Sequence, residues 1–154
     1  MNINDMLSEE SILVDFNASS KKHVLDALSK LAEREIKVSY KTILDNLIKR
    51  EKLGSTGVGN GIAIPHTTEN SIDKPKGFLA ILSNGLEFNA NDDHPVDIIF
   101  LLLAPSNNGS EHLQALALVS RLLKNAELIS KLRGCKTKQS AIAVISQTIQ
   151  DEAA

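Results

Sequence analysis

The sequence predicts a single α/β domain built as an α/β/α sandwich, in which helices cover both faces of a mixed β-sheet. Segments with helical apolar spacing come both before and between runs typical of strands. The run at 96–104, VDIIFLLLA, is almost wholly apolar, as expected for a strand covered on both faces. A length of 154 residues without an interior linker indicates one domain over 1–154.

The strands are predicted from short β-favouring apolar runs bounded by turn residues. They are expected at 12–16, 62–65, 77–82 and 96–104. Pro65 cannot donate to a ladder, so it should end its strand and leave His66 at the carboxyl end. Asn84-Gly85 predicts a hairpin turn to a short companion strand at 86–88, which would make the sheet mixed. The polar segments 67–76 and 89–95 are predicted as loops.

The helices are predicted from the 3.6-residue apolar period and from capping residues. One begins at Lys21 after a cap at Ser19 or Ser20, and a second runs from near Ser39 to Leu53. After a turn at 106–109, Ser110 should cap a third helix. A further helical turn is expected at 128–132 and a last helix at 139–149, with 150–154 as a frayed tail.

Composition excludes several classes of function. A net charge of −2 and 3% aromatic residues argue against nucleic-acid binding. The one cysteine, Cys135, excludes an internal disulfide and a thiolate metal cluster. The first ten residues lack the pattern of a secretory signal, and the longest apolar run is too short to span a bilayer. We therefore expect a cytoplasmic protein with no membrane insertion.

The stretch 50–66, REKLGSTGVGNGIAIPH, carries the strongest functional signal. Its glycines, Gly59 among them, allow backbone N–H groups to approach an anion, and Ser55 and Thr56 add hydroxyl donors. Arg50 adds a permanently charged fork suited to phosphate. Together with His66, these residues indicate a phosphoryl group carried on imidazole.

Each of these residues also has an ordinary structural explanation. Arg50 in the last turn of its helix could simply complement the helix dipole. His66 could be a satisfied histidine at a strand end, and His112 could cap or pack locally near the start of its helix. His23 and His94 are expected at the surface. No metal site is expected, since zinc needs three or four ligands, and no GxSxG nucleophile motif or P-loop lysine occurs.

The same residues resemble the enzyme IIA family of the bacterial phosphoenolpyruvate-dependent phosphotransferase system, of the mannitol/fructose/nitrogen-regulatory type. The active-site pattern of that family is matched by Glu51, by Val58-Gly59 and by the run 62–66, IAIPH. The resemblance extends over nearly the whole chain and includes the start of the helix at His112. Thr67 departs from the pattern, because the family has a small residue there, and it could crowd the imidazole.

The resemblance implies a phosphotransferase that works as a carrier through a phosphohistidine, without a cofactor. His66 would be phosphorylated on Nε2, with His112 as the second active-site histidine and Arg50 beside the phosphate. Ser55, Thr56 and Gly59 would contribute to phosphate binding. The partner would be an HPr-like histidine phosphocarrier protein.

Among the branches of the family, the nitrogen-regulatory enzyme IIA is the most similar. Its members regulate proteins such as potassium transporters and sensor kinases according to phosphorylation state. Two alternatives remain open at this point. One is a sugar-specific IIA that passes phosphate to a separate fructose- or mannitol-type IIB. The other is a protein-binding module that Thr67 has made a poor phosphoryl acceptor.

Overall fold

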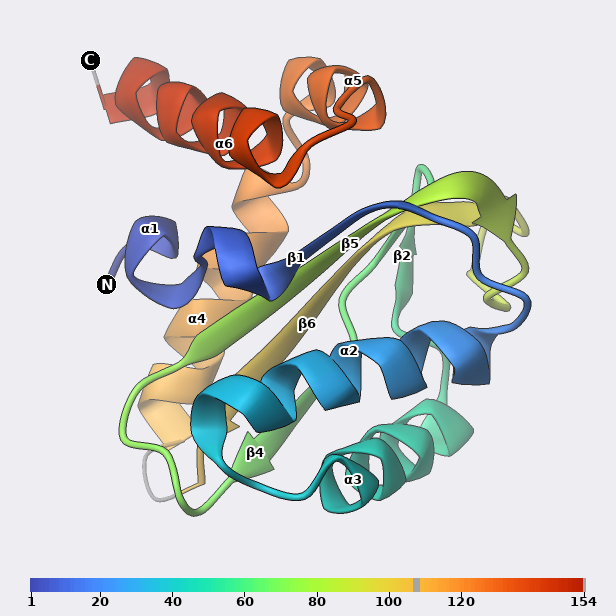
Figure 1. The fold of residues 1–154 in the computed structure, drawn as a ribbon, viewed down its shortest axis with the longest axis vertical. Helices are drawn as coiled ribbons and strands as arrows, with labels where there is room; N and C mark the ends of the chain where they lie inside the picture. Colours follow the sequence, from blue (N-terminus) through green and yellow to red (C-terminus); the bar gives the residue numbers. More distant parts are fainter. Residues whose placement is uncertain (107–108, 154) are drawn as a thin grey trace.

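The structure, a computed structural model, describes residues 1–106 and 109–153 and contains a six-stranded mixed sheet between layers of helices (Figure 1). Five strands follow in the order β1 (Ile12–Phe16), β5 (Lys76–Leu86), β6 (Val96–Pro105), β3 (Ile62–Ala63) and β2 (Gly57–Gly59), and β4 (His66–Glu69) also pairs with β6. The β5–β6 and β2–β3 pairs are antiparallel, and the other pairs are parallel. The predicted α/β/α sandwich is confirmed.

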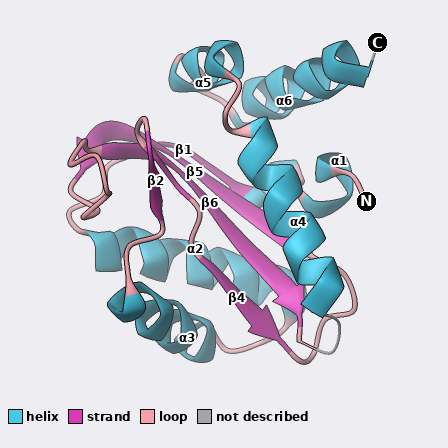
Figure 2. Cartoon of the chain, turned by 180° about the vertical axis from the view of Figure 1, so that it is seen from behind, coloured by secondary structure: helices cyan, strands magenta, loops and turns pink. Residues whose placement is uncertain are grey.

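Two helical layers cover the two faces of this sheet (Figures 1 and 2). One layer contains α2 (Lys21–Ile36) and α3 (Tyr40–Leu53). The other contains α1 (Ile3–Met6), α4 (Gly109–Leu122), α5 (Ala126–Arg133) and α6 (Lys138–Ala153), and the short 3-10 helix η1 (Glu9–Ser11) leads into β1. Because α6 continues to Ala153, residues 150–153 are helical although a frayed tail was expected there.

Strand β6 supplies both halves of the core. Its alternate residues Ile98, Phe100 and Leu102 pack in the cluster that contains α4, α5 and α6. The residues between them, Ile99, Leu101 and Leu103, pack in the cluster that contains α2 and α3. Side chains of a strand point alternately to its two faces, so an almost wholly apolar run is what two covered faces require.

The helix boundaries follow the capping residues for α2 and α3. The Ser20 side chain accepts a hydrogen bond from the His23 N–H at 3.0 Å, and α3 ends at Leu53 before Gly54. The prediction for α4 is wrong by one residue, because the helix begins at Gly109 and Ser110 lies inside its first turn. There the Ser110 hydroxyl accepts from Gln114 Nε2 at 3.5 Å. Part of the turn predicted at 106–109 lies outside the described residues.

The strand predicted at 62–65 ends already at Ala63, and His66 begins a new strand, β4, rather than standing at the end of one. Pro65 has no N–H for the ladder, although its carbonyl accepts from the Leu102 N–H at 2.9 Å. Pairing with the long strand β6 resumes at His66, opposite Leu102, and continues to Glu69. The loop prediction for 67–76 is therefore wrong over 67–69, and also at Lys76, where β5 begins.

The hairpin predicted at Asn84-Gly85 is absent, because β5 runs through both residues to Leu86 with a register shift on the way. A Cβ on Gly85 would lie 2.7 Å from the Pro95 Cβ, so glycine permits close packing against Pro95 rather than a tight turn. The hairpin actually formed joins β5 to β6 through the loop at 87–95.

A different hairpin forms within the glycine-rich stretch, where β2 pairs with β3. Asn60 and Gly61 connect the two strands with φ values of 57° and 82°. Asn-Gly with two positive φ angles is the strongest short-range hairpin signal in a sequence. The hairpin signal of this sequence is therefore the Asn60-Gly61 dipeptide.

Candidate active site

His66 is half-buried at the start of β4, and one of its ring nitrogens is engaged. Its Nδ1 lies 2.7 Å from the carbonyl oxygen of Ile64. A carbonyl oxygen can only accept a hydrogen bond, so Nδ1 carries the hydrogen. In the neutral ring the lone pair is then on Nε2, which makes Nε2 the nucleophilic nitrogen.

His112 lies in the first turns of α4, and the fold brings it beside His66. The two ring centroids are 5.7 Å apart, with an angle of 59° between the ring planes. The Nε2 atom of His112 is buried and has no hydrogen-bond partner within the described part of the chain. Burial lowers the pKa of His112 from its ordinary value, and the charge of the nearby His66 lowers this pKa further.

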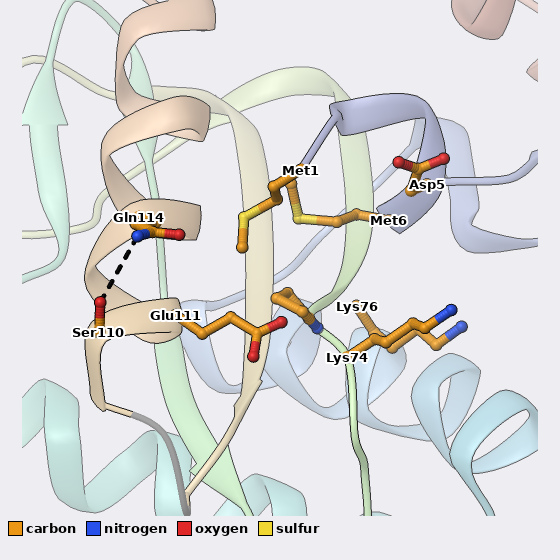
Figure 3. A pocket seen from close by; sticks show the side chains of 9 residues that line it. Met1, Asp5, Met6, Lys74, Lys76, Ser110, Glu111 and Gln114 are labelled. Carbon is orange, nitrogen blue, oxygen red and sulfur yellow. Dashed lines mark hydrogen bonds between the residues drawn. The ribbon is translucent and has the colours of Figure 1, made fainter.

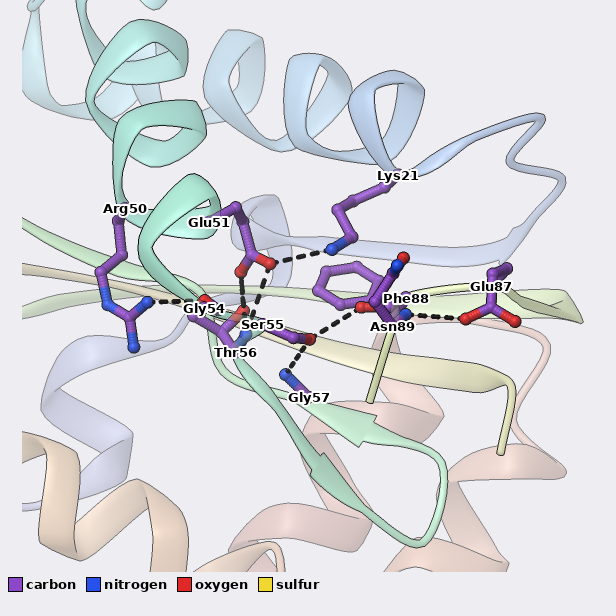
Figure 4. A network of polar contacts seen from close by, with 10 residues as sticks. All are labelled: Lys21, Arg50, Glu51, Gly54, Ser55, Thr56, Gly57, Glu87, Phe88 and Asn89. Atoms are coloured by element: carbon purple, nitrogen blue, oxygen red, sulfur yellow. Dashed lines mark hydrogen bonds and ion pairs between the residues drawn. The ribbon is translucent and has the colours of Figure 1, made fainter. Parts of the chain in front are cut away.

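Arg50 lies in the last turn of α3, as expected, and its guanidinium is directed to the helix end. Nη1 donates to the Gly54 carbonyl at 2.7 Å (Figure 4). This contact agrees with the structural explanation for Arg50, in which its charge complements the dipole at the end of the helix. The bond uses one of the five N–H donors of the guanidinium, so a role toward phosphate remains compatible with it.

The two hydroxyl residues of the glycine-rich stretch have partners inside the protein (Figure 4). Ser55 Oγ donates to the Phe88 carbonyl at 2.7 Å, and Thr56 Oγ1 donates to the Glu51 carboxylate. Gly59 has φ of +95°, and a Cβ there would lie 3.2 Å from an Asp92 carboxylate oxygen. Both hydroxyl hydrogens are thus committed, and the roles of Ser55, Thr56 and Gly59 in phosphate binding stay predictions.

Glu51, known from the sequence only as part of a motif, is the centre of a buried polar cluster (Figure 4). Its side chain is 7% exposed, and its carboxylate pairs with Lys21 Nζ at 3.0 Å. It also accepts from the Thr56 N–H at 3.1 Å. The Lys21 ammonium lies 4.4 Å from the centre of the Phe88 ring, so it also makes a cation–π contact. Lys21 and Glu51 are 30 residues apart in the chain, so no local pattern predicts this pair.

Three large apolar side chains are exposed on α3, α4 and β2. Leu53 at the end of α3 is 86% exposed, Leu113 beside His112 is 69% exposed, and Val58 in β2 is 52% exposed. Figure 2 shows α3, β2 and α4 arranged around β4, the strand that His66 begins. Exposed apolar side chains are typical of a protein-docking surface where they form one continuous patch, whereas single ones are ordinary.

A separate cavity of about 630 Å³ lies between α1, the segment before β5 and the first turn of α4 (Figure 3). Met1, Lys74 and Glu111 are among its lining residues, and neither His66 nor His112 lines it. Within residues 1–106 and 109–153, no group of three or more His, Cys, Asp or Glu could hold a metal ion. No described helix combines the length and the apolar character needed to cross a membrane.

Comparison with known proteins identifies the family. The family model of the phosphoenolpyruvate-dependent sugar phosphotransferase system, EIIA 2, matches residues 5–148. A nitrogen regulatory protein from Bradyrhizobium diazoefficiens is 38% identical over 146 residues, covering 95% of each chain. A fructose-specific EIIA component from Haloferax volcanii is 36% identical over 107 residues, covering 70% of each chain.

A solved structure extends the similarity to the fold. The crystal structure of nitrogen regulatory protein IIA-Ntr from Neisseria meningitidis superposes with a TM-score of 0.86 at 31% identity. The match covers 93% of this chain and 98% of that one. The resemblance seen in the sequence is confirmed: the chain belongs to the EIIA type 2 family, a phosphoryl-transfer component of the phosphotransferase system, and is similar to nitrogen-regulatory members of that family.

Proposed function

We propose that this chain accepts a phosphoryl group on Nε2 of His66 from an HPr-like histidine phosphocarrier, and that it regulates partner proteins according to its phosphorylation state. The observation that carries the proposal is the 2.7 Å contact between His66 Nδ1 and the Ile64 carbonyl. This contact fixes the tautomer and directs the Nε2 lone pair away from the Ile64 carbonyl.

In the proposed step, the lone pair of His66 Nε2 forms a bond to phosphorus as the phosphorus–nitrogen bond of the carrier's phosphohistidine breaks. The electron pair of the broken bond stays on the carrier nitrogen, so the carrier leaves as histidine. The hydrogen on Nδ1 of His66 stays in its bond to the Ile64 carbonyl. The partial negative charge of that carbonyl oxygen stabilises the positive charge that the ring gains when the bond to phosphorus forms.

His112 and Arg50 would stabilise the transferred group. A phosphoryl group brings a charge of about −1.5 to −2 and strong acceptor oxygens. His112 Nε2 is buried beside His66 and lacks a hydrogen-bond partner among the described residues, which suits a role as donor to a phosphoryl oxygen. The negative charge would raise the pKa of His112 and favour its protonated, donating form.

The phosphocarrier would dock on the exposed apolar side chains of Leu53, Val58 and Leu113. They lie on three elements around the strand that His66 begins, so a partner covering them would place its own histidine over Nε2. Covering these side chains would also exclude water from the reacting atoms, which strengthens the electrostatic stabilisation of the transferred charge.

The similarity to nitrogen regulatory proteins supports the regulatory branch. On this proposal the chain acts in the cytoplasm, and its targets are proteins such as potassium transporters and sensor kinases. The fructose-specific relative from Haloferax volcanii favours a second candidate, a sugar-specific IIA that passes phosphate to a separate IIB. A regulator would bind its target differently in its two phosphorylation states and would not phosphorylate a IIB.

The first test is phosphorylation by phosphoenolpyruvate, enzyme I and the cognate phosphocarrier, read by intact-mass analysis. We expect one acid-labile phosphoryl group on the wild type and on a His23→Ala control, and none on His66→Ala. His23 suits the control because it is exposed at the start of α2. A folded wild type that acquires no group, from a carrier shown to be active on another IIA, would contradict phosphotransfer and leave a protein-binding module.

A second incubation then separates the two branches. The phosphorylated chain is mixed with fructose- and mannitol-type IIB proteins, and the loss of its phosphoryl group is followed over time. A stable phosphoryl group supports the regulator, whereas rapid transfer to a IIB supports the sugar-specific candidate.

A further inference from the structure

A series of hydrogen bonds runs from the buried carboxylate of Glu51 to the ring of His66. The first step joins Glu51 to Thr56, which is 4% exposed. The Thr56 N–H lies 3.1 Å from Oε1 and 3.3 Å from Oε2 of Glu51, and the Thr56 hydroxyl also donates to Oε1. The end of α3 therefore fixes the peptide that leads into β2.

The second step crosses the β2–β3 hairpin. The carbonyl of Thr56 accepts a hydrogen bond from the Ile64 N–H at 3.0 Å. Ile64 is itself 2% exposed, and its own carbonyl accepts from His66 Nδ1 at 2.7 Å. The position of the Ile64 carbonyl, and with it the orientation of the imidazole, thus depends on the position of Thr56.

A charged carboxylate is well suited to hold the start of this series. Three donors converge on it, namely the Thr56 N–H, the Thr56 hydroxyl and the Lys21 ammonium. A carboxylate has about four lone-pair sites for them, whereas an amide offers one oxygen. Removing its charge would also leave the ammonium of Lys21, a side chain that is only 24% exposed, without its anionic partner.

We infer that Glu51 is a positioning residue for His66: through Thr56 and Ile64 it holds the imidazole in the tautomer that leaves Nε2 free for the phosphoryl group. Glu51 does not touch the reacting atoms on this account. The inference deepens the proposed function and rests on it for its kinetic consequence, but the tautomer of His66 can be measured whether or not phosphate is transferred.

The test compares Glu51→Gln and Thr56→Val with Glu33→Gln as the matched control. The Glu33 carboxylate accepts from the Tyr40 N–H at 2.9 Å, so it makes the same kind of bond at the other end of α3. Nitrogen-15 chemical shifts of the His66 ring, recorded well above the ordinary imidazole pKa of about 6.5, report the tautomer. Acceptance from the phosphorylated carrier gives kcat and KM.

For Glu51→Gln we expect the His66 ring to become a mixture of tautomers. We also expect kcat for phosphoryl acceptance to fall by between about tenfold and a hundredfold, with an unchanged KM for the carrier, because misplacing a reacting group slows the step without weakening docking. Thr56→Val keeps the N–H bond and should change both measurements in the same direction by less. Glu33→Gln should leave both at wild-type values.

Wild-type tautomer and wild-type kcat in folded Glu51→Gln and Thr56→Val would overturn the inference. Loss of the fold in both variants would also overturn it, because Glu51 would then have a purely structural role. A wild type that accepts no phosphoryl group would contradict the proposed function instead. In that case the nitrogen-15 shifts alone still decide whether Glu51 positions the ring.

Discussion

The two histidines of the site are held in opposite ways. The ring of His66 is held through Nδ1 by the Ile64 carbonyl, at the end of a hydrogen-bond series that begins at Glu51. The ring of His112 comes from a helix and has a buried Nε2 without a partner in the described structure. One imidazole is thus orientated before any ligand arrives, and the ring beside it has a buried polar atom without a partner among the described residues. Such a difference is expected between a nucleophile and a second group that binds the phosphoryl group after its transfer.

The largest expected effect is a difference between the two histidines in the rate of phosphoryl acceptance after substitution. His66→Ala should abolish phosphoryl acceptance, whereas His112→Ala should slow it by about a hundredfold to a thousandfold, the usual cost of one lost donor to developing charge. Rapid-quench kinetics with the phosphorylated carrier measures both rates. Equal losses in the two variants would show that the histidines do not have different roles.

A second prediction concerns stability rather than transfer. His112→Phe keeps a ring of similar shape and removes the unpaired buried nitrogen, so it should leave folding unchanged or stabilise it by up to about 1 kcal/mol. Urea unfolding gives the difference in free energy. A loss of more than about 1 kcal/mol would indicate that His112 has a polar partner that stabilises the fold.

The third prediction is a pH dependence specific to His112. Since burial lowers its pKa in the folded chain, the unfolded chain binds the proton more readily below the ordinary imidazole pKa of about 6.5. The contribution of His112 to stability is fully present above that pH and is lost as the pH falls through the folded pKa. The stability of His112→Phe relative to wild type should therefore rise on acidification. Paired urea titrations that show a constant difference would contradict this.

The smallest expected effect concerns Thr67, the residue that departs from the family pattern. Thr67 and His66 are neighbours in β4, so their side chains point to opposite faces of the strand. Thr67→Ala should therefore leave the rate of phosphoryl acceptance unchanged and cost about 1 kcal/mol or less through β-propensity. A clear rise in that rate would show that Thr67 crowds the imidazole after all.

The sequence predicted best what depends on local pattern. The cap at Ser20, the end of α3 at Leu53 and the double-sided burial of β6 all follow from capping chemistry and apolar period. The Asn84-Gly85 prediction failed because that dipeptide also suits a bulged strand packed against Pro95, and Pro95 lies at the far end of the β5–β6 loop, outside the local turn pattern.

The residues of the candidate site could be named from the sequence, but their contacts could not. His66 and Arg50 could be chosen from the motif, yet only the fold shows that His112 lies beside His66. The hydroxyls of Ser55 and Thr56 suggested phosphate donors, but their acceptors are Phe88 and Glu51. A hydroxyl has one hydrogen, and the sequence does not say which acceptor receives it.

Strand β6 has a consequence for how the molecule unfolds. Alternate residues of this one strand pack in the core under α4, α5 and α6, and the residues between them pack in the core under α2 and α3. Neither helical layer can detach without exposing a strand that the other layer still needs, so the two layers should melt in one cooperative transition. The amide hydrogens of β6 would then exchange with solvent only through global unfolding, and their protection would measure the stability of the whole domain.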